Sequence, residues 1–184
     1  MASVLIPLAQ GCEELEAVTI IDLLRRAEVN VVTAGLDEHS IKASRGVVIV
    51  PDTDLTSALK QTFEMIVLPG GLPGTDFLND DARIKRLLCE MNEQGKWIAA
   101  ICAAPKVLAS AGLLENKKVT SYPGTLEEFD VAGMVYSSAS VVVDGNIITS
   151  RGPGTAMDFA LTLIELLCGI ERRKAVEKPL QRPV

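Results

Sequence analysis

Trp97-Ile98-Ala99-Ala100-Ile101-Cys102-Ala103-Ala104-Pro105 begins as an apolar run and ends in residues that favour the start of a helix. A strand does not continue through Ala-Ala-Pro, whereas proline fits the first helical turn because its missing N–H would be unpaired there. Cys102 is therefore expected where a strand ends and a helix begins. Open α/β sheets carry their sites at this edge, and the helix dipole lowers a thiol pKa there. The alternative is a buried structural thiol, since free cysteine is among the most buried residue types.

The same change from strand to helix recurs along the chain. Apolar β-branched runs predict strands over residues 4–8, 29–34, 47–50, 66–68, 97–101, 141–143 and 147–150, and helical periods predict helices over 13–27, 81–93, 105–111 and 155–168. This alternation is typical of an α/β fold with a mainly parallel sheet and helices on both faces. Asp144-Gly145 between two apolar runs predicts a hairpin with a type I′ turn. The tail over 178–183 is expected to fray.

The composition is typical of one globular domain, which we expect to span residues 1–184, with 48% hydrophobic and 23% charged residues. A net charge of −6 gives no nucleic-acid signal, because such binding needs Lys and Arg to neutralise phosphates. No apolar run approaches the ~20 residues of a membrane span and the first residues lack a basic segment, so we expect a cytoplasmic protein without a signal peptide. Four cysteines without CxxC spacing predict free thiols and no metal site.

The predicted helix over 13–27 places a carboxyl group on its inner face. At 100° per residue, Glu16 shares one stripe with Ile20 and Leu23. Desolvation among apolar neighbours raises a carboxyl pKa, and proton-transfer residues are tuned toward neutral pH in this way. Glu13 and Glu14 are explained by capping and by the helix dipole, with Glu14 projecting toward another side.

The same helix is apolar on a second side, away from the Glu16 stripe. Leu15, Val18 and Ile21 lie there, so the helix has more apolar circumference than one core requires. This pattern favours a subunit contact, and a two-fold homodimer is the commonest closed arrangement. The alternative is a helix whose outer side is covered by loops.

Two backbone amides are candidates for stabilising an oxyanion. The run over 66–71 predicts a buried strand that ends in a Pro-Gly-Gly turn, and such glycines let N–H groups approach another group closely. If this strand lies beside the Cys102 strand, the N–H groups of Gly71 and Ala103 point at the same reacting atom. Further candidates, for the edge of the site or for substrate contact, are Glu13, Arg45, Tyr122 and Pro153. Arg45 either lines the mouth of the site or pairs with an acidic residue.

Four motifs, over 13–17, 67–71, 99–105 and 149–155, resemble in order and spacing the ThiJ/PfpI superfamily, most closely the DJ-one branch (Parkinson disease protein seven) and its bacterial relatives. The resemblance implies a flavodoxin-like three-layer sandwich that forms a homodimer and needs no cofactor. It also implies an oxidation-sensitive catalytic cysteine, matched by Cys102, and a protonated glutamate, matched by Glu16. The oxyanion contacts of the family fall on the backbones of Gly71 and Ala103.

The function that the resemblance implies is a cofactor-independent glyoxalase or deglycase. It would act on α-oxoaldehydes such as methylglyoxal or on their early adducts with protein side chains, and so protect against carbonyl and oxidative stress. The alternative is a non-enzymatic redox sensor or chaperone that uses oxidation of Cys102. A hydrolase of the wider superfamily is a third class.

The chain departs from the pattern of its relatives in two places. Where these often carry a histidine before a proline, this chain has Tyr122, and its sole histidine is His39 in a polar turn. A Cys–His pair is therefore not expected, and Cys102 is expected to work with a carboxyl group. Cys12 is expected at the same sheet edge as Cys102, either as a resolving thiol or as a residue that fills space.

Overall fold

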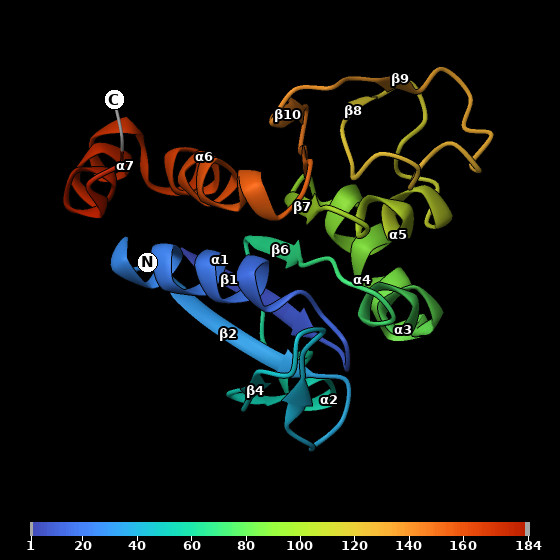
Figure 1. Cartoon of the computed structure of the whole chain (residues 1–184). Helices are drawn as coiled ribbons and strands as arrows, with labels where there is room; N and C mark the ends of the chain where they lie inside the picture. Colours follow the sequence, from blue (N-terminus) through green and yellow to red (C-terminus); the bar gives the residue numbers. More distant parts are fainter. Residues whose placement is uncertain (1, 183–184) are drawn as a thin grey trace.

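A seven-stranded sheet forms the centre of the structure, a computed structural model that describes residues 2–182 (Figure 1). The strands of this sheet are β1 (Ser3–Leu8), β2 (Asn30–Gly35), β5 (Thr53–Asp54), β6 (Met65–Leu68), β7 (Trp97–Ile101), β10 (Val141–Asp144) and β11 (Ile147–Ser150). Their order is β10-β11-β7-β6-β1-β2-β5, and every neighbouring pair is parallel except the β10–β11 hairpin. The mainly parallel sheet expected from the sequence is confirmed.

Strand β1 supplies side chains to both hydrophobic layers, because successive strand residues point to opposite faces. Val4, Ile6 and Leu8 pack on the face covered by α1 (Glu14–Arg26), α6 (Ala156–Cys168) and α7 (Ile170–Glu177). Leu5 packs on the other face, which is covered by α2 (Leu55–Ala58), α3 (Gly74–Asp80), α4 (Ala82–Glu93) and α5 (Pro105–Ser110). Figure 1 shows α1 beside α6, with α3, α4 and α5 away from them. This is the flavodoxin-like three-layer sandwich.

Several small elements lie outside the main sheet. β3 (Ile41–Lys42) pairs antiparallel with β4 (Val48–Ile49), and β8 (Lys118–Val119) pairs parallel with β9 (Val135–Tyr136). The strand predicted over 47–50 is therefore shorter than expected and belongs to a separate ribbon. Two short 3₁₀ helices, η1 (Pro153–Thr155) and η2 (Lys178–Leu180), complete the described elements. No helix within residues 2–182 is long and apolar enough to cross a membrane.

Two local expectations are corrected. The hairpin forms, but Asp144 pairs with Ile147, so Gly145 and Asn146 make the loop. Only Gly145 has a positive φ, +61°, which is the pattern of a type II′ turn and not of type I′. The tail does not fray over the described residues, because Leu180 packs against the core and Arg182 pairs with Glu177 and Asp158. The end of the predicted tail, at Pro183, lies outside the described residues.

Candidate active site

Cys102 follows β7 directly, in a backbone conformation that residues with a side chain rarely adopt. Its φ is +63°, which costs roughly 1–3 kcal/mol and persists only where the surroundings hold it. The Cys102 N–H donates to the Ser150 carbonyl at 3.0 Å, and the Cys102 carbonyl accepts from the Tyr122 N–H at 2.8 Å. The residue is therefore fixed on both sides, with 9% of its surface exposed. The predicted sharp turn between strand and helix is confirmed.

The carboxyl group of Glu16 lies beside this thiol. Glu16 is fully buried on α1, on the stripe predicted from the helical period, with Ile20 and Leu23 buried beside it. Its Oε2 accepts from the Gly70 N–H at 2.8 Å, and the carboxyl group also hydrogen-bonds with the Cys102 thiol. Its Oε1 is buried without a hydrogen-bond partner among the described residues. When the Glu16 carboxyl group is neutral, Oε1 can carry its proton.

The Pro-Gly-Gly turn after β6 approaches the thiol and the carboxyl group so closely that it has no room for side chains. A Cβ at Gly70 would lie 2.6 Å from the Cys102 Cβ and 2.8 Å from Glu16 Oε2. Gly71 has a φ of +93°, and the backbone N–H groups of Gly71 and Ala103 both act on the Cys102 thiol so as to lower its pKa. The structure thus brings together all four residues expected at the chemical centre. These two N–H groups are placed to donate hydrogen bonds to an oxyanion on a carbon atom bonded to the sulfur.

Burial controls the ionisation of the pair. It raises the pKa of Glu16 to about 7, and the charge of Glu13 acts in the same direction, while the Gly70 N–H and the Cys102 thiol oppose it. Burial likewise raises the pKa of Cys102 to about 12, and the charge and hydrogen bond of Glu16 add to this effect. The expectation of a thiol pKa lowered by the helix start is therefore wrong. Burial and a neighbouring carboxylate outweigh the amides of Gly71 and Ala103, and α5 has only six residues to supply a dipole.

These values determine where the proton is near neutral pH. Glu16 is the group that titrates there, while the thiol holds its proton as long as the carboxylate is charged. A thiolate therefore forms when the Cys102 proton passes to Glu16, because a neutral carboxyl group no longer repels the sulfur and donates a hydrogen bond to it.

Replacing Glu16 with glutamine is expected to remove most of the pH dependence of stability. An unfolded carboxyl group loses its proton near pH 4.5 and the folded one near pH 7. The native state therefore holds more protons in this window, and the free energy of unfolding falls as the pH rises through it, by at most about 3 kcal/mol. Urea unfolding at about pH 5 and pH 8 measures the slope. Glu93→Gln, at an exposed carboxyl group, should keep the wild-type slope, and an unchanged slope in Glu16→Gln would contradict the raised pKa.

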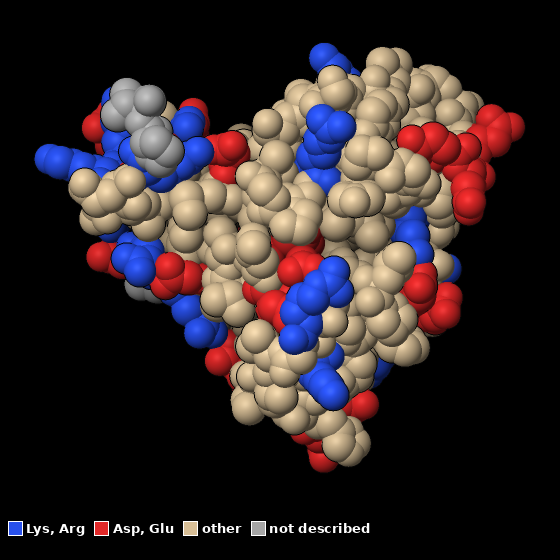
Figure 2. Space-filling view, viewed as in Figure 1, with Lys and Arg blue, Asp and Glu red and all other residues tan. Residues whose placement is uncertain are grey.

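Two carboxylates at the start of α1 organise the loop over residues 44–47. Glu13 is the N-cap, and its carboxylate accepts from the Leu15 N–H at 3.4 Å and from the Ser44 hydroxyl at 3.1 Å. Glu14 faces this loop, on another side of α1 than Glu16. It is buried under the loop, where it accepts from the Ser44 hydroxyl at 2.9 Å and from the Arg45 N–H at 2.8 Å. Figure 2 shows acidic atoms recessed near the middle of one face, where Figure 1 has the start of α1.

The side chains of the other candidates for the edge of the site are exposed or half-buried. The side chain of Arg45 is exposed, and only the backbone of this residue is anchored. The Tyr122 ring is 54% exposed and lies next to Gly152, at which a Cβ would be 3.4 Å from its Cδ2. Pro153 starts η1 and is half-buried. His39 is exposed beside Asp37, with 3.1 Å between Nδ1 and Oδ1, in the turn where the sequence placed it.

All four cysteines are free. Cys12 is buried, and burial raises its pKa to about 11, with the charges of Glu14 and Glu13 adding to this effect. Cys89 is half-buried against the Ala111 carbonyl, whereas Cys168 is exposed. No cluster of three or more His, Cys, Asp or Glu side chains within residues 2–182 could hold a metal ion.

Sequence reasoning missed two supports of the site. Ser150 holds the Cys102 N–H through its carbonyl, and any residue type offers such a carbonyl, so no sequence signal marks it. Gly70 was part of a predicted turn, but its specific role was not predicted: the absence of a side chain at this position leaves room for the thiol and the carboxyl group. Two glycines in succession after a strand were the signal that could have found it.

The chain is similar to known proteins over almost all of its length. A family model described as "DJ-1/PfpI family" matches residues 2–166. "Protein dj-1beta" of Drosophila melanogaster is 44% identical over 97% of this chain and 96% of its own, and "Glutathione-independent glyoxalase DJR-1.2" of Caenorhabditis elegans is 36% identical over 97% and 95%. The crystal structure of the Drosophila melanogaster DJ-1beta protein superposes with a TM-score of 0.94 at 43% identity, covering 100% of this chain and 99% of that one.

Proposed function

Because the chain belongs to the DJ-1/PfpI family, we propose that it is a glutathione-independent glyoxalase that uses Cys102 as nucleophile and Glu16 as proton carrier. The observation that carries the proposal is the buried thiol–carboxyl pair with two backbone amides aimed at its sulfur. The glyoxalase named among the relatives supports the same reaction class. The assignment of one domain to residues 1–184 and the cytoplasmic location stay predictions.

The reaction proceeds by addition of the sulfur to the aldehyde carbon of methylglyoxal. The thiol proton passes to the Glu16 carboxylate as the carbon–sulfur bond forms, and the new oxyanion accepts from the N–H groups of Gly71 and Ala103. Glu16 then gives this proton to the oxyanion, which yields a hemithioacetal and restores the carboxylate.

A proton then moves from the former aldehyde carbon to the neighbouring carbonyl carbon, with Glu16 carrying it, while the hydroxyl proton of the hemithioacetal passes to the neighbouring oxygen, and a thioester of lactate results. Water cleaves this thioester, which releases lactate and restores the Cys102 thiol. One carbon is oxidised and the other reduced, so methylglyoxal and water become lactate without an external electron carrier.

The exposure of Cys102 favours small substrates. With 9% of the residue accessible, a two- or three-carbon α-oxoaldehyde reaches the sulfur more readily than an adduct on a folded protein surface. Deglycation of early protein adducts is therefore the secondary activity of this proposal. Tyr122, Pro153 and Arg45, together with Glu13, are proposed to border the entrance.

A homodimer is part of the proposal. Leu15 and Val18 on α1 are 51% and 48% exposed, and Val47 and Val48 beside the loop over 44–47 are also exposed. Glu14 joins the two segments through the Val47 N–H at 3.4 Å, so the apolar side chains belong to neighbouring segments. A second copy covering them would bury apolar surface of the kind found at subunit contacts.

The direct test follows methylglyoxal loss and lactate formation by the purified protein without glutathione. Glu16→Gln is expected to lower kcat/KM by about a hundredfold or more, because glutamine cannot take the thiol proton. In the wild type, kcat/KM should rise with pH up to about pH 7, where the pair loses its first proton, and the variant should lack this limb. Glu93→Gln is the matched control. Absence of lactate from the wild type, or full activity in Glu16→Gln, would overturn the proposal.

A further inference from the structure

A cavity opens at the carboxyl edge of the sheet, beyond the ends of β1 and β2. It measures about 410 Å³, and Leu36, Ile41 and Phe77 form its apolar lining. Neither Cys102 nor Glu16 lines it, so it is separate from the thiol–carboxyl pair. Cavities of about 300–1,000 Å³ hold small molecules, and open α/β sheets bind ligands at this edge.

The apolar lining combines a buried floor with an accessible aromatic ring. Ile41 is 1% exposed, whereas Phe77 is 45% exposed on α3. When a flat or aliphatic group packs on this phenyl ring, apolar surface is removed from water, and this burial is favourable. The lining therefore suits the hydrocarbon body of a ligand.

The charged side chains of the cavity are all acidic. Asp81 is neutralised by Arg83, with 2.6 Å between Oδ2 and Nη2. Asp37 has only the exposed His39 beside it, and the Asp80 carboxylate forms no hydrogen bond or ion pair with the described residues 2–182. Two carboxylates thus remain without a permanent cation, and the potential at the rim attracts a positive group.

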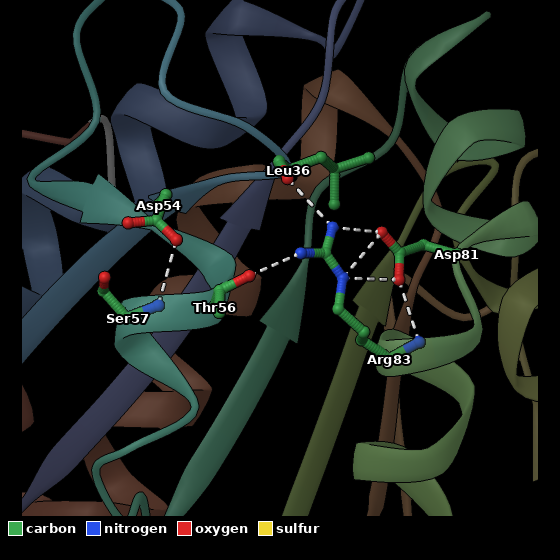
Figure 3. Close-up of polar contacts among 6 residues, drawn as sticks. All are labelled: Leu36, Asp54, Thr56, Ser57, Asp81 and Arg83. Atoms are coloured by element: carbon green, nitrogen blue, oxygen red, sulfur yellow. Dashed lines mark hydrogen bonds and ion pairs between the residues drawn. The ribbon is translucent and has the colours of Figure 1, made fainter.

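The wall between Leu36 and Asp81 is fixed before any ligand arrives. The Arg83 guanidinium forks onto Asp81 and also donates to the Leu36 carbonyl and to the Thr56 hydroxyl, each at 2.9 Å (Figure 3). The same close-up shows Asp54 capping α2 through the Ser57 N–H at 3.0 Å. A wall held by contacts that join α2, the start of α4 and the backbone after β2 costs little ordering entropy on binding.

We propose that this cavity binds a small organic ammonium ion with an aryl or alkyl body, the body packing on Phe77 and Leu36 and the ammonium group lying between Asp37 and Asp80. Charge and lining select this class. An anion is repelled by the carboxylates, and a neutral hydrocarbon leaves them without a counter-ion. The site is independent of the proposed chemistry at Cys102.

The test is calorimetric or NMR titration of the 184-residue protein with phenethylamine at neutral pH, where this probe is a cation. The matched neutral probe is 2-phenylethanol, which has the same body, and it is expected to bind at least about fivefold more weakly. Asp80→Asn should weaken phenethylamine binding by about fivefold and Phe77→Ala by about tenfold. Glu93→Gln, which removes an exposed carboxylate of α4 outside the cavity, should leave the affinity unchanged.

Both altered positions are exposed, so these variants are expected to fold like the wild type. The proposal is overturned if the two probes bind equally, if neither substitution weakens binding, or if no binding is detected at millimolar probe concentrations. It is also overturned if binding disappears in Cys102→Ala, because the probe would then occupy the thiol site.

Discussion

Cys102→Ala is expected to abolish the conversion of methylglyoxal to lactate, with a loss of at least about a thousandfold in kcat/KM. Every covalent step of the proposed reaction passes through the sulfur, so its removal leaves the reaction without its nucleophile. Alanine keeps the Cβ of the native residue, and the backbone hydrogen bonds to Ser150 and from Tyr122 do not involve the thiol. The variant should therefore fold, and circular dichroism and urea unfolding check that it does.

The control for this loss is another free thiol of the same chain. Cys168 is exposed at the end of α6, far along the chain from the site, and Cys168→Ser is expected to keep wild-type activity. If Cys102→Ala retained more than about a tenth of the wild-type rate, the sulfur would not be the nucleophile. If Cys168→Ser were as inactive, general thiol loss and not the site would explain the result.

Gly71→Ala is expected to lower the free energy of unfolding by about 4 kcal/mol or more. A Cβ at this position would lie 2.3 Å from the Glu13 N, 2.6 Å from the Cys12 carbonyl carbon and 2.7 Å from the Gly11 carbonyl oxygen. All three are backbone atoms, so no side chain can swing aside to make room. The positive φ of +93° adds strain of its own. Urea unfolding monitored by Trp97 fluorescence measures the loss.

Gly46→Ala separates the clash from the strain of a positive φ. Gly46 has nearly the same φ, +95°, but a Cβ there would meet nothing within 4 Å. Its cost is expected to be only about 1–2 kcal/mol, the price of a left-handed residue with a side chain. If the two variants lost equal stability, the close approach of the Gly71 turn to the start of α1 would not be a constraint on the fold.

The sequence predicted well those helices and strands that are long enough to show a hydrophobic period, or that end at residues which clearly terminate them. β7 has the predicted limits because Ala-Ala-Pro ends a strand and starts a helix. The two-residue strands β5, β8 and β9 are too short to show any period. α3 was missed because Gly74, Asn79 and Asp80 favour a helix poorly, although burial of Leu78 holds it in place.

At the site, the burial and the raised pKa of Glu16 were predictable, whereas the pKa of Cys102 was not. The helical period placed Glu16 inside, and burial then raised its pKa as expected. The pKa of Cys102 depends on the distance to Glu16 and on the loss of water around the sulfur, which no local pattern contains. The position of Glu14 depends on the loop over 44–47 folding back onto it, a contact across 30 residues of chain.

Three segments meet at the Cys102 thiol, and their assembly determines the stage of folding at which this thiol can first become reactive. Glu16 and Gly70 are 54 residues apart, and Cys102 follows still later, after two further helices and a strand. Parallel pairing of β1, β6 and β7 is a non-local event, slower than the formation of any single helix. A nascent or partly unfolded chain therefore carries an ordinary cysteine, and its special chemistry is acquired only at the last stage of assembly. The rate of lactate formation from methylglyoxal would accordingly report the fraction of molecules that have reached the native state.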